Sequence, residues 1–270
     1  VEGRHSFDFW YSYNCCDDHL HPHYWTNDSQ WNHPIEVHEW SPRHETSVAI
    51  DFIRNRDRKR PFALFVSMNP PHPHWDLVPP EYLKPYGAAT YVDLLNRPNV
   101  DLSLGTWETS ENPTRTAKNH VKNYFAAITG IDEEFGRLMQ CLKEERLDEN
   151  TIVVFTSDHG EMMGSHDRIQ KFIHYEESIG IPFIIRWPGR IRSGWDDLLL
   201  GAPDVMPTLL GAMGLSQFIP SDVQGGDYSG ALSGRKVEKP GSLYYLWPRI
   251  RGVRTDRYTF IIDRTGDEEH

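Results

Sequence analysis

One stretch of sequence, residues 151–166, constrains the fold and the function of this chain more than any other. Residues 152–156 are apolar or β-branched, which is typical of a buried strand, and the strand ends abruptly in Asp158-His159-Gly160. Glycine permits the tight backbone turn that follows. Two side chains that can bind a metal therefore lie side by side at the carboxyl end of a predicted strand. Open α/β sheets usually bind their ligands at that end, so we expect the functional site there.

The composition limits the class of protein. With 270 residues, the chain is long enough for one large domain, or for a domain with a small subdomain. Its formal net charge of −11 argues against nucleic-acid binding, which usually needs a basic surface. Three cysteines, two of them adjacent, predict neither a disulfide scaffold nor a structural zinc site. No run approaches the roughly 18 apolar residues of a transmembrane helix, so we expect none.

The pattern of apolar residues predicts alternating strands and helices. Residues 62–68 are typical of a second buried strand. The strand ends before Pro70, because prolines cannot continue a sheet, and a proline-rich loop that carries His72 follows. Residues 113–146 place apolar side chains at spacings of three and four, which predicts the longest helix. Gly130 interrupts this helix at a tolerable cost of about 1 kcal/mol. The other predicted elements are helices 41–55 (with Ser41 as N-cap) and 204–213, and strands 181–187, 242–246 and 258–262.

This order of elements predicts an α/β fold in which a mixed, mainly parallel sheet lies between helices. We expect residues 1–215 to form this core. From residue 216 the chain becomes rich in glycine and serine, and two short strands follow. We therefore expect residues 216–270 to begin a small carboxy-terminal α+β subdomain with antiparallel strands.

Asp158 and His159 offer carboxylate oxygens and one imidazole nitrogen. A set of ligands rich in oxygen, with one nitrogen, suits a divalent cation such as calcium, magnesium or manganese. The pair alone leaves a second interpretation open, in which Asp158 caps a turn and His159 bonds to the backbone. The residues that surround the pair favour the metal site.

These surrounding residues resemble the second half of a type I sulfatase, a family of the alkaline phosphatase-like superfamily. The resemblance is carried by Asp-His-Gly-Glu-Met-Met-Gly-Ser-His at 158–166, by Lys171, and by Tyr-Glu-Glu-Ser-Ile-Gly-Ile-Pro at 175–182. Further matches are Pro-Pro-His-Pro-His at 70–74 and Arg-Gly-Val-Arg-Thr-Asp-Arg-Tyr at 251–258. The resemblance covers nearly the whole chain. It implies an alkaline phosphatase-like fold and the hydrolysis of sulfate esters.

The resemblance also implies roles for individual residues. Asp158 and His159 would bind a single calcium ion. Lys171 would donate to the sulfate and neutralise charge on the leaving oxygen. His72, rather than His74, would contact the sulfate or protonate the leaving alcohol. An anionic ester needs cations at its oxygens and a proton for its departing group, so these residue types fit the reaction.

Part of the sulfatase pattern is absent from this sequence. The family's nucleophile is a formylglycine made from the cysteine of a Cys-x-Pro-Ser-Arg motif, and neither Cys15, Cys16 nor Cys141 lies in such a motif. The paired amino-terminal aspartates that complete the metal site are absent as well. We therefore expect the formylglycine and these aspartates upstream, and this chain to be a truncated piece that is inactive alone. Half a site binds calcium weakly, because calcium usually takes about six to eight oxygen ligands.

Other functions stay open. A phosphodiesterase or phosphonate monoester hydrolase of the same superfamily would share Asp158 and His159, although the surroundings of Lys171 favour a sulfatase. A non-catalytic sulfatase-like module that binds a sulfated glycan is a third possibility, against which the retained site residues argue. The expected ligand is a sulfated small molecule or glycan. A sheet surface without its amino-terminal strand would favour a homo-oligomer or association with the missing segment. Periplasmic, secreted and cytoplasmic locations are all compatible with the sequence.

Overall fold

A computed structural model describes residues 7–100, 117–248 and 250–263 of the chain. The chain divides into two compact units. Unit 1 consists of Val1–Asp148 and Met162–Ile169, and unit 2 of Glu149–Glu161 and Gln170–His270. The predicted boundary near residue 216 stays a prediction. The three cysteines are free, and no helix among the described residues has the length and apolar character needed to cross a membrane.

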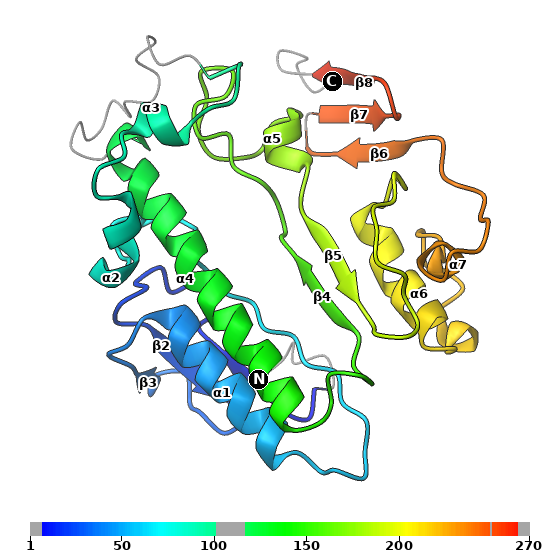
Figure 1. Ribbon diagram of the computed structural model, residues 1–270, viewed down its shortest axis with the longest axis horizontal. Helices are drawn as coiled ribbons and strands as arrows, with labels where there is room; N and C mark the ends of the chain where they lie inside the picture. The colour runs from blue at the N-terminus through cyan, green and yellow to red at the C-terminus, as the bar shows by residue number, and fades with distance from the viewer. Residues whose placement is uncertain (1–6, 101–116, 249, 264–270) are drawn as a thin grey trace. The chain divides into compact units, whose positions relative to one another are not determined.

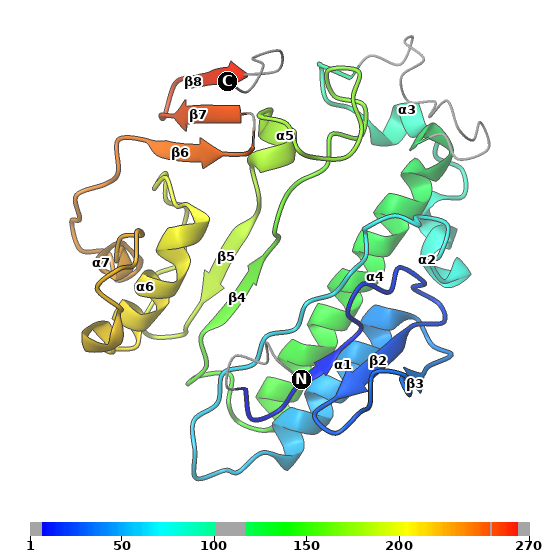
Figure 2. The ribbon, with the colours of Figure 1, turned by 180° about the vertical axis from the view of Figure 1, so that it is seen from behind.

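Unit 1 is built on two long helices that lie side by side, α1 (Ser41–Asn55) and α4 (Ala117–Glu144) (Figure 1, Figure 2). Its smaller elements are β1 (Tyr11–Ser12), β2 (His23–Thr26), β3 (Ile35–Glu36), α2 (Pro80–Leu83), the 3-10 helix η1 (Lys84–Tyr86) and α3 (Tyr91–Leu94). The three strands form one antiparallel sheet in the order β1-β2-β3. Both predicted long helices are confirmed, and the predicted residues 113–116 lie outside the described residues.

Helix α1 has the predicted bounds but a different cap. The N-cap is Trp40 rather than Ser41, and Pro42 lies in the first turn. Proline is tolerated there because the first N–H groups of a helix have no partner within the helix. The buried face of α1, which includes Ala49 and Ile53, contacts α4. Burial of this face against α4 therefore stabilises the pair of helices.

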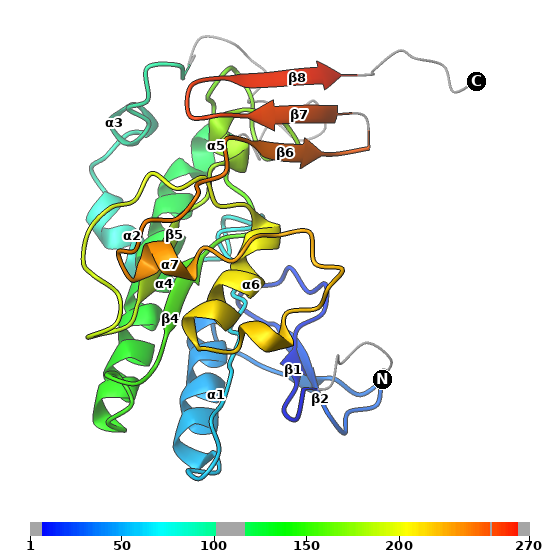
Figure 3. The ribbon, with the colours of Figure 1, turned by 90° about the vertical axis from the view of Figure 1, so that its right-hand side faces the viewer.

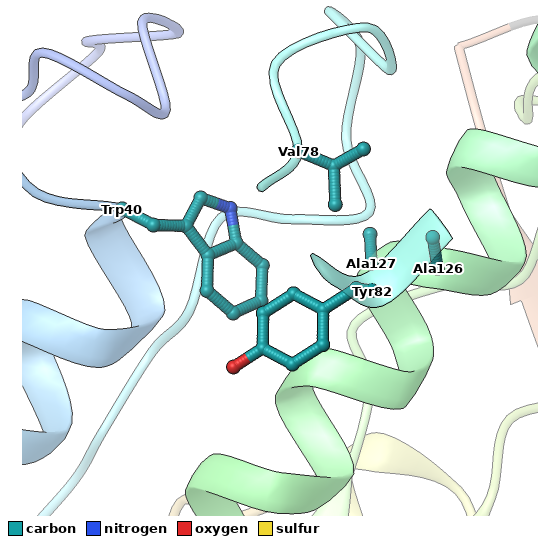
Figure 4. Packing of buried hydrophobic residues seen from close by; sticks show 5 residues of the cluster. All are labelled: Trp40, Val78, Tyr82, Ala126 and Ala127. Atoms are coloured by element: carbon teal, nitrogen blue, oxygen red, sulfur yellow. The ribbon is translucent and has the colours of Figure 1, made fainter. Parts of the chain in front are cut away.

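A cluster of buried side chains surrounds the middle of α4 in unit 1 (Figure 4). Its members are Trp40, Val78, Tyr82, Ala126 and Ala127. The ring centroids of Trp40 and Tyr82 lie 5.2 Å apart. A Cβ added at Gly130 would come within 2.5 Å of Trp40 and 2.8 Å of Tyr82. The glycine that the pattern marks as an interruption is therefore required where α4 passes the two rings.

Unit 2 contains two antiparallel sheets and short helices (Figure 3). Strands β4 (Val153–Thr156) and β5 (Phe183–Arg186) pair with each other. Strands β6 (Leu243–Leu246), β7 (Ile250–Arg254) and β8 (Thr259–Asp263) form the second sheet in that order. The helices are α5 (Glu176–Ile179), α6 (Ala202–Ala212), the 3-10 helix η4 (Ser216–Phe218) and α7 (Ser229–Leu232). The predicted strands after residue 150 and the predicted helix 204–213 are confirmed, and β7 is an additional strand.

The expected mainly parallel sheet is not confirmed, because every strand pair among the described residues is antiparallel. The prediction of a buried strand at residues 62–68 is wrong. The segment forms no strand; its residues alternate between exposed and half-buried, and Phe65 is 76% exposed. A strand needs a neighbouring backbone to complete its hydrogen bonds, and none of the described strands supplies one here. An apolar pattern identifies a segment suited to a sheet, but it does not specify a partner.

Candidate functional site

The predicted metal-binding pair lies at the end of β4, in residues 157–160, which we call the strand-end loop. Ser157 Oγ donates to the carbonyl oxygen of His159 at 2.7 Å, and the backbone N–H of His159 donates to Asp158 Oδ1 at 2.9 Å. The carboxylate of Asp158 therefore caps the turn, as one interpretation predicts. It is also 83% exposed, so Oδ2 stays accessible for a ligand.

The imidazole of His159 presents one nitrogen to Asp158. Its Nδ1 lies 2.8 Å from the carbonyl oxygen of Gly160. Because a carbonyl oxygen only accepts, Nδ1 carries the hydrogen. In the neutral ring Nε2 then has a free lone pair, and it lies 3.3 Å from Asp158 Oδ2. Histidines that bind metals usually hold their other N–H in this way, so the two atoms form a pair of electron donors that a cation can bridge.

Backbone packing against α5 fixes the end of the strand-end loop. The N–H of Gly160 donates to the carbonyl oxygen of Ser178 at 2.8 Å. A Cβ at Gly160 would lie 2.1 Å from the carbonyl oxygen of Glu177. Glycine is therefore required by the close approach of two backbones. This contact holds the two donors at the carboxyl end of β4.

Lys171 lies in unit 2, shortly before α5 along the chain. Its Nζ is 5.5 Å from the centre of the Phe172 ring, which is a cation–π distance. Among the described residues, no hydrogen bond or ion pair joins Lys171 to Asp158 or His159. The sulfate contact of Lys171 stays a prediction.

His72 lies in unit 1, in residues 69–75, which we call the Pro-His loop. Its Nδ1 is 2.7 Å from the carbonyl oxygen of Pro73, so Nδ1 carries a hydrogen here too. The Nε2 atom is then the nitrogen that can exchange a proton with a ligand. The side chain of His72 is 35% exposed, whereas His74 lies among the exposed residues. The structure thus gives His72 a defined ring orientation.

Residues 16–19 hold the Pro-His loop in unit 1, and no local pattern reveals this contact. His19 is 2% exposed and donates from Nε2 to the carbonyl oxygen of His72 at 3.0 Å. Burial lowers the pKa of His19, which favours the neutral ring. Asn69 donates to Asp17 Oδ1 at 3.1 Å, and the same oxygen lies 3.6 Å from His72 Nδ1. Asp17 is therefore a neighbour of His72 that the sequence analysis missed.

The structure brings Asp158 and His159 together, whereas Lys171 and His72 belong to different units. In the part of the chain that the structure describes, no three histidine, cysteine, aspartate or glutamate side chains form a group that could hold a metal ion. Calcium usually takes about six to eight oxygen ligands, so Asp158 and His159 supply only part of a calcium site.

Comparison with known proteins gives the family. A model of the Sulfatase family matches residues 4–215. An endo-4-O-sulfatase of Bacteroides thetaiotaomicron is 40% identical over 287 residues, which cover 97% of this chain and 54% of that protein. An ulvan-active sulfatase of Formosa agariphila is 30% identical and covers 96% of this chain and 50% of that protein.

A solved structure of a similar protein supports the same family and identifies the fold. It comes from work on the metabolism of multiple glycosaminoglycans by Bacteroides thetaiotaomicron, and it matches with a TM-score of 0.87 and 37% identity. The match covers 98% of this chain and 57% of that one. The fold class is therefore the alkaline phosphatase-like mixed α/β class. Within that class, the chain belongs to the sulfatase family, and it spans about half the length of the curated relatives it matches.

Proposed function

We propose that the protein hydrolyses sulfate esters of a sulfated glycan. The observation that carries this proposal is the pair of electron donors at the end of β4, Asp158 Oδ2 and His159 Nε2, which lie 3.3 Å apart. A sulfate ester is anionic, so a cation held at these donors would attract the sulfate group and stabilise its charge. The names of the relatives, an endo-4-O-sulfatase and an ulvan-active sulfatase, support this reaction.

In the proposed site, Asp158 and His159 hold a calcium ion. The family generally uses a divalent metal and a formylglycine nucleophile. The carboxylate oxygens of Asp158 suit a hard cation, and the Nδ1–H of His159 is already held by a carbonyl oxygen. When bound, the cation supplies positive charge at the sulfate oxygens. The donor chemistry fits part of a calcium site, and further oxygen ligands must come from other residues.

Lys171 and His72 would act on the sulfate and on the leaving group. The ammonium group of Lys171 would neutralise charge that develops on the ester oxygen. His72 Nε2 would hold the proton for the departing alcohol, because Nδ1–H is bonded to the carbonyl oxygen of Pro73. The nucleophile of the reaction would be the formylglycine that the family generally uses.

A mainly parallel sheet is also part of the proposal. Strand β4 pairs with β5 along one edge, and none of the described strands pairs with its other edge. On β5, Ile184 is 62% exposed. An open edge beside exposed apolar side chains suits pairing with a further strand or with a second copy of the chain.

Calcium titration and ester hydrolysis test the proposed function. Isothermal titration calorimetry would compare the wild-type chain with Asp158→Ala, and with Asp222→Ala as an exposed carboxylate outside the site. Asp158→Ala should weaken calcium binding by about tenfold or more, whereas Asp222→Ala should not. In the full-length protein, Asp158→Ala should slow hydrolysis of 4-nitrophenyl sulfate and of a sulfated glycan by about 100-fold or more.

Other outcomes would change the assignment. Faster turnover of matched phosphate or phosphonate esters would favour a phosphodiesterase or phosphonate monoester hydrolase. Binding of sulfated glycans by the full-length protein without turnover would favour a non-catalytic module. Tight calcium binding by the 270-residue chain would show that the metal site is nearly complete within it, and would overturn the expectation of half a site.

A further inference from the structure

Two aromatic side chains of unit 2 form an exposed stack, which we call the aromatic platform. The ring centroids of Phe172 and Trp247 lie 4.8 Å apart, and the ring planes are inclined by 20°. Phe172 is nevertheless 58% exposed and Trp247 47% exposed. A ring pair that only fills a core is buried, as Trp40 and Tyr82 are in unit 1. The platform therefore offers apolar surface to a ligand.

The backbone of Phe172 adopts a conformation that large side chains rarely adopt. Its φ is +70°, and the φ of Gln170 is +66°. This left-handed region suits glycine, whereas a side chain there crowds the backbone. Strained residues persist where the surrounding structure or a function requires them. Glycine would adopt this φ more readily than phenylalanine, and strained positions of this kind cluster at ligand-binding sites.

Backbone hydrogen bonds to Ile250 hold Trp247, which directly follows β6. The backbone N–H of Trp247 donates to the carbonyl oxygen of Ile250 at 2.9 Å, and the carbonyl oxygen of Trp247 accepts from the backbone N–H of Ile250 at 3.1 Å. The guanidinium group of Arg251 also donates to the carbonyl oxygen of Trp247. These bonds fix the backbone that carries the indole ring, and they place the positive charge of Arg251 at that backbone.

Positive charge at the platform is notable in a chain whose formal net charge is −11. Lys171 lies over the ring of Phe172, and Arg251 bonds to the backbone of Trp247. We propose that the aromatic platform is a glycan subsite, which binds a sugar ring of an anionic polysaccharide next to the sulfate ester that is hydrolysed. This inference rests on the proposed function, because it takes Lys171 as the residue that contacts the sulfate.

The chemistry of an anionic polysaccharide matches these groups. The C–H bonds of a pyranose ring are weakly positive, and the face of an aromatic ring is negative, so the two attract each other. Sulfate or carboxylate groups on the sugars can accept hydrogen bonds from Lys171 and Arg251. Phe172 and Trp247 each have only two side-chain torsions, so they lose little entropy when a ligand covers them. A small aryl sulfate has no sugar ring to place on the platform.

The test is calorimetric titration of a sulfated glycosaminoglycan hexasaccharide into the 270-residue chain. Trp247→Ala should weaken binding by about tenfold, the usual scale of a lost stacking contact. Trp247→Phe keeps an aromatic face and should stay within about threefold of the wild type. Trp195→Ala is the matched control, because Trp195 lies in the same unit and is 104% exposed. It should bind as the wild type does.

Phe172→Gly separates binding from folding. Glycine removes the strain at positive φ, which offsets the lost ring contact, so the melting temperature should stay close to that of the wild type. Binding of the hexasaccharide should still weaken by about tenfold. Unchanged affinity in Trp247→Ala or in Phe172→Gly would overturn the subsite, as would a wild-type chain that does not bind the hexasaccharide.

A desulfated hexasaccharide and the hydrolysis assay keep the two proposals apart. In one outcome, both hexasaccharides bind in a manner that depends on Trp247, but the full-length protein hydrolyses no sulfate ester. This outcome would support the subsite and rule out the proposed function. Hydrolysis of 4-nitrophenyl sulfate without binding of the hexasaccharide would remove the subsite and keep the proposed function.

Discussion

Unit 1 and unit 2 differ in how they bury apolar side chains. Among the described residues, every buried aromatic or sulfur-containing side chain lies in unit 1, and so does every buried aliphatic side chain except that of Pro207 in α6. The strands of unit 2 instead expose large apolar side chains, such as Ile184, Tyr244, Leu246 and Phe260, each more than 60% exposed. Unit 1 therefore has a hydrophobic core of its own, whereas the sheets of unit 2 have little apolar cover in the described residues.

The two units also differ in the hydrogen bonds of a buried carboxyl group, Glu45 in unit 1 and Asp204 in unit 2. In unit 1, Glu45 Oε1 accepts from the hydroxyl of Tyr24 at 2.9 Å, and Oε2 has no hydrogen-bond partner. In unit 2, Asp204 accepts from the backbone N–H groups of Gly226 and Gly201 at 2.7 and 2.8 Å. Unit 1 thus contains an incompletely bonded buried acid, Glu45, as well as Glu134, which pairs with Arg43 and Arg137, whereas the buried Asp204 of unit 2 ties loops together by hydrogen bonds.

The largest expected effect tests whether the core of unit 1 carries the stability. Trp40→Ala should lower the free energy of unfolding by about 3–5 kcal/mol, because it removes a ring that is 2% exposed. Urea titration followed by circular dichroism measures this change. The control Trp195→Ala in unit 2 should stay within about 0.5 kcal/mol of the wild type. Equal losses in the two variants would break the comparison between the units.

A second effect concerns pH and the buried acid of unit 1. Burial raises the pKa of Glu45 from 4.5 to about 8. The folded state then holds a proton that the unfolded state has released, so stability is greatest below the unfolded pKa and falls as the pH rises through the folded pKa. The loss should be about 3 kcal/mol between about pH 5 and about pH 8. Burial also raises the pKa of the neighbouring Tyr11 to about 12, above this window.

Glu45→Gln has no proton to lose and should flatten this part of the profile. Urea titrations of the wild type and the variant at several pH values would show the difference. If both profiles fell in parallel, the acid in the core of unit 1 would not be the cause.

The smallest expected effect compares two glycines of α4. Gly130→Ala should lower the free energy of unfolding by about 1–3 kcal/mol, because its Cβ would overlap the rings of Trp40 and Tyr82. Gly136→Ala should raise it by up to about 1 kcal/mol, because nothing lies within 4 Å of the added Cβ and alanine favours a helix. Thermal unfolding of both variants measures these changes. If both substitutions raised the melting temperature, the rings of Trp40 and Tyr82 would have moved aside to accept the new Cβ at position 130.

Local patterns in the sequence predicted the three longest helices, α1, α4 and α6, and the strands β4, β5, β6 and β8, but not the short helices or the strands β1, β2, β3 and β7. The spacing of apolar residues placed α1 and α4, and the abrupt end of an apolar run placed Asp158 and His159 beyond β4. Contacts between distant residues were not predictable in this way. The partner of β4, and the carboxylate of Asp17 beside His72, both depend on where separate segments meet. No short window of sequence contains that information.

The stack of Phe172 on Trp247 was missed for the same reason, because 75 positions separate the two rings along the chain. One of its causes is visible only in the backbone. A positive φ at a phenylalanine has no signature in composition or periodicity. The roles of His72 and Lys171 rest on resemblance to a family rather than on a physical pattern.

The close approach of Gly160 to the carbonyl oxygen of Glu177 matters for anyone who would transplant this site into another scaffold. A peptide that copied only the strand and the strand-end loop would leave Gly160 without the backbone that it packs against. The smallest portable module is therefore discontinuous and must include α5, which follows the loop at a distance along the chain. Any designed replacement at position 160 would have to begin by moving α5.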